Sequence, residues 1–504
     1  MISSGERTRV AESRAIPLSA DALDQADAAT LHGRVRAQLA AHPRQSAVRL
    51  LPDGLDAFAV RVHGARSAQR NLDIQTYIWH DDATGRYIAR ELMRAADRGV
   101  RVRVLLDDMD ARPRDVALEA LDKHSRVQVR IFNPFHTRSG ALRTLAEVFR
   151  RGERLNHRMH NKAWIVDDTF AVVGGRNIGD EYFASASDVN FIDLDALLLG
   201  PAVTATACEF ERYWQSEASI PIRRLRKYSR IKLRPRRYRR QLDASARAAE
   251  QSRYVQHLNG TTAAEALLDS GFEWSSDVRV VADDPRKALQ AHAPEYARVL
   301  DCMASEILAT QRELLLISPY FVPGIGGTAV LRSLALQRAE VAVLTNSLAA
   351  TDVAAVHGAY ARYRHPLLDA GVRLFEMKHS PRLEEGHRLR LGSARASLHS
   401  KAAVIDGERV FVGSFNIDPR SARLNCEMGV WIRSPPLARE LVRSFRVGTE
   451  LERAFQVSLD AAGKLLWTER DAGQLETHSR EPHASRGRRF VAWLLTLLPI
   501  ESQL

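Results

Sequence analysis

The chain repeats one histidine-centred pattern. The two copies are His160-x-Lys162-x4-Asp167-x6-Gly174-x2-Asn177 and His399-x-Lys401-x4-Asp406-x6-Gly413-x2-Asn416. Every gap is the same over the 18 positions from the histidine to the asparagine. Only 8 of the 73 cationic residues are lysines, so composition predicts 17 × (8/504) × (61/504), or about 0.03, matches to the histidine–lysine–acid part. Two copies with the same glycine–asparagine continuation are therefore no coincidence.

The residue types in this pattern suit the transfer of a phosphodiester. A neutral imidazole can attack phosphorus while a second, protonated imidazole gives its proton to the departing oxygen. Developing charge can be stabilised by two ammonium groups and two amides, those of Lys162, Lys401, Asn177 and Asn416. We therefore expect His160 and His399 to be the working pair, with a phosphohistidine intermediate and a bell-shaped dependence of rate on pH. The scheme requires no metal and no cofactor.

Each histidine needs a carboxylate to orient it. A carboxylate that accepts the Nδ1 proton leaves Nε2 free to react. By distance along the chain, Asp193 is the candidate partner of His160, with Asp195 as a weaker alternative. Glu427 is the corresponding candidate for His399.

The acids inside the pattern, Asp167 and Asp406, have two interpretations. Both are candidates for catalysis because they share the fixed spacing of the histidines. Each also follows an apolar run that reads as a strand. A carboxylate at the end of a strand, bound to backbone or to a basic neighbour, explains them equally well.

Apolar runs around both copies predict strands that alternate with helices. The strands are expected in matching pairs at residues 74–79 and 316–322, 100–106 and 341–344, and 163–166 and 402–405. Because side chains two apart on a strand point the same way, each pattern places its histidine and lysine on one face. Pro201 and Pro435 or Pro436 mark the starts of helices. We expect two similar α/β halves, each with a largely parallel sheet, packed together with one active site at their interface.

The repeat divides the chain into five segments. We expect a polar N-terminal segment at residues 1–45 and a first domain at residues 46–217. A basic linker or insert at residues 218–290 precedes a second domain at residues 291–456. Residues 457–504 form a C-terminal tail.

The composition, 45% hydrophobic and 27% charged, is that of a globular protein. Cys208, Cys302 and Cys426 are too far apart in the chain for a disulfide framework or a Cys-x-x-Cys metal site, which fits a reducing compartment. No apolar run suits a secretion signal or a bilayer span. We therefore expect the chain to be kept in the cytoplasm, unless it docks on a membrane from the side.

The formal charge of +12 is concentrated in one segment. Residues 223–240 hold eleven arginines or lysines and no acid, with Tyr228 and Tyr238 interleaved. Such a segment is attracted to anionic lipid headgroups, at about 1 kcal/mol for each cation near the surface. A solvated linker and a patch for nucleic-acid backbones are the alternatives.

The C-terminal segment carries a second signal for membranes. Arg486, Arg488 and Arg489 precede an apolar run that includes Trp493. The run is too short to cross a bilayer as a helix. A short amphipathic helix at a membrane interface and a helix docked in the protein core are the two interpretations.

The two patterns resemble the paired HKD motifs of the phospholipase D superfamily. The residues around Tyr77, the segments 99–108, 155–162 and 345–352, and the terminal segment 493–500 are similar to bacterial cardiolipin synthases, most of all the shorter cardiolipin synthase C group. The resemblance covers roughly residues 45–504. It implies a phosphatidyl-histidine intermediate, transfer of a phosphatidyl group to phosphatidylglycerol, and a peripheral place on the cytoplasmic side of the bacterial inner membrane among anionic phospholipids. It also implies that His160 is the nucleophile and His399 the acid.

The pattern is compatible with other functions. Water and alcohols compete for the same phosphohistidine, so a phospholipase D or a nuclease would use the same chemistry. The apolar C-terminal run favours lipid over nucleic acid as the partner. A non-catalytic binding protein that kept the fold is disfavoured by the intact histidines, lysines and asparagines of both copies.

Overall fold

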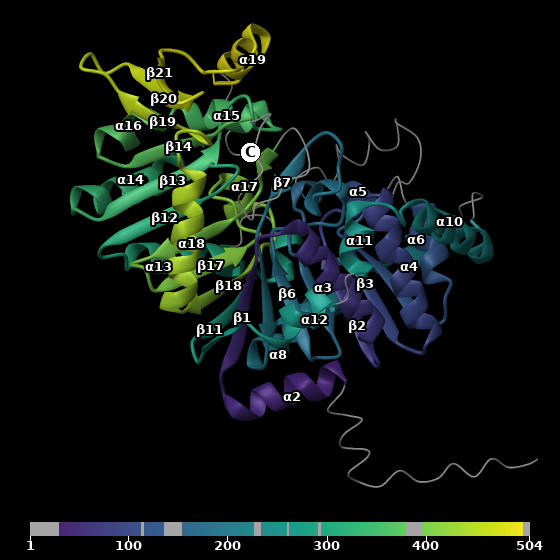
Figure 1. Cartoon of the computed structure of the whole chain (residues 1–504). Helices are drawn as coiled ribbons and strands as arrows, with labels where there is room; N and C mark the ends of the chain where they lie inside the picture. Colours follow the sequence, from purple (N-terminus) through teal and green to yellow (C-terminus); the bar gives the residue numbers. More distant parts are fainter. Residues whose placement is uncertain are drawn as a thin grey trace, which may run out of the picture.

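The computed structural model describes residues 30–111, 115–135, 154–225, 233–259, 262–290, 294–379 and 396–496. Within these ranges the chain forms two α/β halves that lie side by side (Figure 1). Each half is built around one large sheet, and a small parallel sheet made of β7 (Asn190–Ile192) and β15 (Ala396–Leu398) joins them. The predicted architecture of two packed α/β halves is confirmed.

The two large sheets share one plan. The first contains β1 (Ser46–Leu51), β2 (Asn71–Thr76), β3 (Arg101–Asp107), β4 (Val127–Phe132), β5 (Ala163–Val166), β6 (Phe170–Gly174), β8 (Asp195–Leu199), β9 (Ser219–Pro221) and β10 (Glu273–Ser275), in the order β10-β1-β8-β6-β5-β2-β3-β4-β9. The second contains β11 (Val278–Ala282), β12 (Glu313–Ile317), β13 (Glu340–Asn346), β14 (Arg373–Met377), β16 (Ala402–Ile405), β17 (Arg409–Gly413), β18 (Met428–Arg433), β19 (Ala454–Leu459), β20 (Leu465–Asp471) and β21 (Gln474–His478), in the order β11-β18-β17-β16-β12-β13-β14-β19-β20-β21. Apart from β10 at one edge and β20–β21 at another, the sheets correspond strand for strand.

The expectation of largely parallel sheets is wrong. Only β2–β3–β4 and β12–β13–β14 pair in parallel, and the other pairs within the two large sheets are antiparallel. The strand after each histidine returns through a tight turn, in which Asp167, Asp168, Asp406 and Gly407 have positive φ. A turn this short can only join antiparallel strands, because a parallel crossover needs a dozen or more residues.

Helices cover the outer faces and part of the interface. In the first half they are α2 (Leu31–Ala41), α3 (Gly54–Ser67), α4 (Ala83–Asp97), α5 (Asp108–Ala111), α6 (Asp115–Asp122), α8 (Pro201–Gln215), α9 (Ile222–Leu225), α10 (Pro235–Ala248), α11 (Arg253–Asn259) and α12 (Thr262–Asp269). In the second half they are α13 (Arg298–Leu308), α14 (Gly324–Leu336), α15 (Ala354–Ala361), α16 (Arg364–Asp369), α17 (Pro419–Arg423), α18 (Pro435–Gly448) and α19 (Arg486–Thr496). The helices predicted from proline, α8 and α18, begin at Pro201 and Pro435.

The core has an inner layer that belongs to both halves. One apolar cluster covers the helix side of the first sheet and another covers the helix side of the second. Between them, a third cluster combines side chains of both sheets with those of α8 and α18, including Ile165, Phe210, Val404 and Leu441. Because burying apolar area at about 25 cal/mol per Å² is the main favourable contribution to packing, this shared layer fixes the halves face to face.

The segment expected to be a basic linker is folded where the structure describes it. On α10, Tyr238, Leu242 and Ala246 form a buried stripe four residues apart, which is the spacing of one helix face. Arg239 forms a two-pronged ion pair with Asp97 at 2.7 and 2.8 Å. Residues 226–232 of the basic segment lie outside the described residues. Within residues 218–290, α9 to α12 pack on helices of the first half, β9 and β10 join its sheet, and β11 joins the second sheet, so the described part is folded rather than a solvated linker.

The structure bears on two expectations about membranes, the absence of a spanning helix and the presence of a short C-terminal helix. In the described ranges, no helix combines the length and the apolar character that crossing a bilayer demands. All three cysteines are free thiols. The predicted C-terminal helix is α19, which packs beside α15 and buries Ala492 against Leu348.

Candidate active site

The first histidine lies where the first half meets the second. His160 precedes β5, and its backbone N–H donates to the carbonyl of Cys426 across the interface at 2.8 Å. Its ring is buried, and Nδ1 lies 2.9 Å from Oε2 of Glu427. Glu427 precedes β18 of the second half, so the carboxylate that orients His160 comes from the other copy of the repeat.

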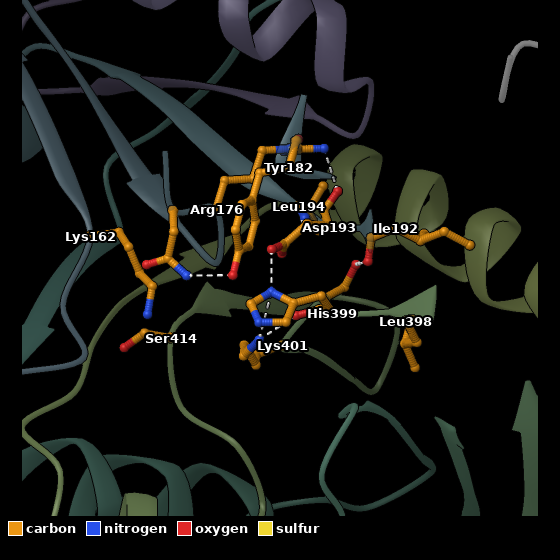
Figure 2. A network of polar contacts seen from close by, with 12 residues as sticks. Lys162, Arg176, Tyr182, Ile192, Asp193, Leu194, Leu398, His399, Lys401 and Ser414 are labelled. Atoms are coloured by element: carbon orange, nitrogen blue, oxygen red, sulfur yellow. Dashed lines mark hydrogen bonds and ion pairs between the residues drawn. The ribbon is translucent and has the colours of Figure 1, made fainter. Parts of the chain in front are cut away.

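The second histidine is held by the corresponding contacts, with the roles of the two halves exchanged. The His399 backbone N–H donates to the carbonyl of Ile192 at 2.8 Å, and its Nδ1 lies 2.5 Å from Oδ2 of Asp193 (Figure 2). The pairing expected from distance along the chain is therefore wrong, because each carboxylate serves the histidine of the opposite half. The cause is topological: both carboxylates sit at strand ends that reach the interface, beside β8 in one half and β18 in the other.

Both lysines of the pattern point into the same buried space. Nζ of Lys162 donates to the carbonyl of His160 at 2.5 Å. Nζ of Lys401 lies 3.0 Å from Nδ1 of His399 and donates to that residue's carbonyl (Figure 2). Each ammonium group can form three hydrogen bonds, so both keep donors for a bound anion. Each histidine and lysine lies just before its strand, β5 or β16, so their sharing of one strand face stays a prediction.

The two asparagines differ in their contacts. Asn177 accepts from the Ile78 N–H at 3.1 Å and donates its amide to the Tyr182 hydroxyl at 2.9 Å. Oδ1 of Asn416 is buried and has no hydrogen-bond partner among the described residues. A buried amide oxygen without a partner is unfavourable by about 1–3 kcal/mol. Asn416 is thus the asparagine with unused polar capacity, and phosphate binding by either asparagine stays a prediction.

The structure places Asp167 and Asp406 away from the histidines. The Asp167 carboxylate accepts the backbone N–H groups of Gln69, Arg70 and Asn71, each at 2.7 Å, just where β2 begins. Asp406 receives the same three-residue cradle at the start of β12. The four residues of β5 or β16, roughly 13 Å of chain, separate each acid from the histidine end of its strand. The expectation that these acids take part in catalysis is therefore wrong: they anchor strands.

Asp195, the weaker orienting candidate, is also structural. Its carboxylate pairs with Arg61 at 2.9 Å and Arg176 at 3.2 Å, and all three side chains are buried. Arg176 in turn donates to the carbonyl of Asp193, which fixes the backbone that carries the His399 partner (Figure 2).

The site is buried and electropositive, and this shifts its pKa values. Burial, and then the ammonium groups of Lys162 and Lys401, hold the pKa of His160 well below its usual value. Burial and Lys401 also lower the pKa of His399, but Asp193 opposes them. Burial lowers the pKa of Lys401 to about 8. The site therefore favours neutral imidazoles and attracts anions.

The two orienting carboxylates differ in the direction of their pKa shifts. Burial raises the pKa of Glu427, and Lys162 only partly opposes this. Burial also acts on Asp193, but His399 and Lys401 outweigh it and bring the pKa of Asp193 below its usual value. Asp193 is thus the more readily ionised of the two carboxylates, and its charge partly offsets the lowering of the pKa of His399.

Sequence reasoning missed Ser414. Its hydroxyl donates to Oε2 of Glu427 at 2.5 Å, the oxygen that His160 also uses. The first copy has Gly175 at the matching place, where an added Cβ would lie 2.2 Å from Oδ1 of Asp193. The signal was present as Gly-Ser in one copy and Gly-Gly in the other.

Other contacts around the rings were also missed. Tyr77 packs edge-on to His160 with ring centres 5.1 Å apart. Phe191 stacks on His399 at 4.9 Å, and Tyr182 contacts the same ring edge-on at 5.3 Å. Such packing excludes water from the imidazoles and fixes their orientation. A tyrosine after a buried strand was the only sequence signal, and it marked Tyr77 alone.

A buried acid positions the residue before His160. The Asp107 carboxylate accepts the backbone N–H of Met159 at 2.8 Å and pairs with Arg158 at 3.3 Å. Burial raises the pKa of Asp107, and Arg158 opposes this. Asp107 ends β3, where the sequence shows only an acid after an apolar run.

Three groups of side chains in the described ranges have metal-ligand types within 4.8 Å of one another. They are Glu469–His478–His483, His80–Asp82–Glu181 and His357–Glu376–Glu481. His160 and His399 belong to none of them.

Comparison with known proteins gives a family assignment over most of the chain. The family model "Cardiolipin synthase, PLD-like domain" matches residues 62–214 and 303–447. Cardiolipin synthase C of Escherichia coli (strain K12) is 39% identical over 470 residues, covering 91% of this chain and 96% of that protein. A cardiolipin synthase of Staphylococcus aureus (strain Mu50) is 25% identical, covering 81% of this chain and 69% of that protein.

Among solved structures, phosphatidylserine synthase from Haemophilus influenzae Rd KW20 has a TM-score of 0.58. The match covers 94% of this chain and all of that one at 12% identity, which shows a shared fold. Taken with the duplicated histidine pattern and the crossed carboxylates, these matches show that the chain belongs to the cardiolipin synthase family of phospholipase D-like phosphatidyl-transferring enzymes.

Proposed function

We propose that this protein is a cardiolipin synthase that transfers a phosphatidyl group to phosphatidylglycerol through a phosphohistidine. The observation that carries the proposal is the convergence of two histidine–carboxylate pairs, each shared between halves, beside Lys162 and Lys401. Two imidazoles with separate partners are what a double-displacement reaction needs.

His160 is the nucleophile in this mechanism. Its low pKa leaves the ring neutral at neutral pH, and Glu427 accepts the Nδ1 proton so that Nε2 faces phosphorus. Nε2 forms the P–N bond while the bond from phosphorus to the departing alcohol oxygen breaks. Lys162 and Lys401 stabilise the charge on the non-bridging oxygens.

His399 is the acid of the first step and the base of the second. Asp193 stabilises its protonated form, so it can give a proton to the departing oxygen. The acceptor hydroxyl then attacks the phosphohistidine, the P–N bond breaks, and its proton returns to His399. Each cycle therefore restores both rings to their starting states.

The same proposal includes a peripheral place on the cytoplasmic face of the inner membrane. On α19 the side chains of Phe490, Val491, Trp493 and Leu494 are 44–59% exposed. Arg486 and Arg488 lie at the start of the same helix. Exposed apolar side chains beside arginines suit an anionic lipid interface.

The test is lipid analysis of a cardiolipin-deficient bacterium that expresses the wild type, His160→Ala or His365→Ala. His365 is an exposed histidine of α16 and serves as the matched control. Cardiolipin should appear with the wild type and the control but not with His160→Ala. Phosphatidic acid without cardiolipin would replace the proposal with a hydrolase, and cardiolipin from His160→Ala would refute the mechanism.

A further inference from the structure

A loop of the second half is fastened beside His399. Residues 347–353 follow β13, which ends at Asn346. The Asn346 side chain donates to the Leu398 carbonyl at 2.9 Å and accepts the Leu398 N–H at 3.0 Å. Ser397 donates its hydroxyl to the Ala350 carbonyl at 3.1 Å. Leu398 is the residue before His399, so the loop and the catalytic histidine share one rigid support.

This loop presents an exposed carboxylate, that of Asp352. The Tyr320 hydroxyl reaches both oxygens of Asp352, at 2.9 and 2.7 Å. Tyr320 is itself fixed, because the Ser318 hydroxyl donates to its carbonyl at 2.6 Å and accepts the Ile417 N–H at 3.1 Å. Ile417 follows Asn416 of the repeated pattern, which places Tyr320 and Asp352 at the rim of the site.

The electrostatics agree with this placement. The charge of Asp352 reaches Lys401, where it opposes the burial that lowers the pKa of the lysine. It also reaches Tyr182, the tyrosine that packs against the His399 ring, and helps burial to raise the pKa of that phenol. Asp352 thus lies on the His399 side of the site.

A carboxylate at this position is unsuited to phosphate, because two anions repel each other. It suits hydroxyl groups, which donate hydrogen bonds to carboxylates. A carboxylate has about four lone-pair positions, and the single hydroxyl proton of Tyr320 occupies one. Among the described side chains, Tyr320 is the one that donates a hydrogen bond to Asp352. The remaining lone pairs of the Asp352 carboxylate face solvent, because Asp352 is exposed.

We propose that Asp352, held by Tyr320, is the subsite that binds the hydroxyl-bearing headgroup of the acceptor. The inference rests on the proposed function and names its acceptor chemistry: a glycerol headgroup with at least two free hydroxyls. One hydroxyl donates to Asp352 while the other attacks the phosphohistidine, its proton passing to His399. Asp352 positions the acceptor and thereby favours transfer over hydrolysis by water.

The test measures how phosphatidylglycerol in detergent micelles is divided between cardiolipin and phosphatidic acid. The variants are Asp352→Asn, Tyr320→Phe and the control Asp277→Asn, an exposed acid in the turn before β11. The ratio of cardiolipin to phosphatidic acid should fall about tenfold in Asp352→Asn, the loss of one hydrogen bond to a charged group. It should fall less in Tyr320→Phe and not at all in the control.

An unchanged ratio in Asp352→Asn would overturn the inference, and so would an equal fall of both products. A second measurement keeps the inference testable if Asp352→Asn does not fold. With the wild type and added alcohols, glycerol should be phosphatidylated several-fold more efficiently per mole than 1-propanol, and equal use would overturn the inference. A wild type that forms neither cardiolipin nor phosphatidyl alcohols would instead refute the proposed function.

Discussion

The orienting of each histidine by a carboxylate of the opposite half leads to a prediction about the pH dependence of the rate. Asp193→Asn removes the charge that lies 2.5 Å from the His399 ring. A hydrogen bond to a charged group contributes about 1.5–3 kcal/mol, which is about 1–2 units of pKa at 1.36 kcal/mol per unit. Because Asp193 stabilises the protonated ring, its removal lowers the pKa of His399 further below the usual value.

The direction of the change in rate follows from the role of His399. As the proposed acid, His399 must be protonated, so activity should be lost as pH rises through its pKa. In Asp193→Asn the alkaline limb of the pH–rate profile should therefore move to lower pH by about 1–2 units. The rate at neutral pH should fall by roughly 10- to 150-fold, the factor that corresponds to 1.5–3 kcal/mol.

Glu427→Gln is the matched variant at the other histidine. As the proposed nucleophile, His160 must be neutral, so activity should be lost as pH falls through its pKa. Removing the charge of Glu427 should move the acidic limb to lower pH and leave the alkaline limb in place. The assay is kcat/KM for a chromogenic phosphodiester from pH 4 to pH 10, a range that spans the unperturbed histidine value on both sides.

Two results would refute this reasoning. If Asp193→Asn moved the acidic limb and Glu427→Gln the alkaline limb, the roles of His160 and His399 would be reversed. If neither variant moved a limb, the carboxylates would not orient the histidines.

Two further predictions concern stability and membrane binding. Asp167→Asn should lower the free energy of unfolding by about 1–3 kcal/mol in urea titrations, because one of the two carboxylate oxygens that accept the backbone N–H groups at the start of β2 is lost. Asp168→Asn, at an exposed position, is the control. If Asp167→Asn lost activity without losing stability, a catalytic role for Asp167 would be restored. Replacing Phe490 and Trp493 together with serine should reduce flotation with anionic vesicles at least tenfold, since each exposed apolar side chain contributes about 1.5–3 kcal/mol when buried in lipid. Equal flotation of this double variant and the wild type would rule out α19 as the membrane contact.

The parts of the fold that were predicted depend on local pattern. The strands after His160 and His399, the helices that begin at Pro201 and Pro435, and the equivalence of the halves follow from spacing and period. Pairing direction was missed because it depends on turn geometry. The Asp167 turn needs positive φ in non-glycine residues, which leaves little trace in the sequence.

The parts of the site that were missed depend on contacts between distant residues. The carboxylate partners were identified correctly as residue types, but they were assigned to the wrong histidines, because distance along the chain says nothing about which side of an interface a strand end faces. Ser414 contacts Glu427, and Asp107 contacts the backbone of Met159, so neither contributes to the site except through a residue distant in the sequence. The tight cradle around Asp167 likewise involves backbone groups almost 100 positions away.

The exchange of carboxylates between halves has a consequence for biosynthesis. While a ribosome is still translating the chain, the first half emerges before the residues that complete its reactive centre exist. His160 then lacks Glu427, and Asp193 has no imidazole to orient. A chain that is cut short or fails to dock its second half therefore lacks both histidine–carboxylate pairs, so the proposed chemistry requires the complete, docked chain.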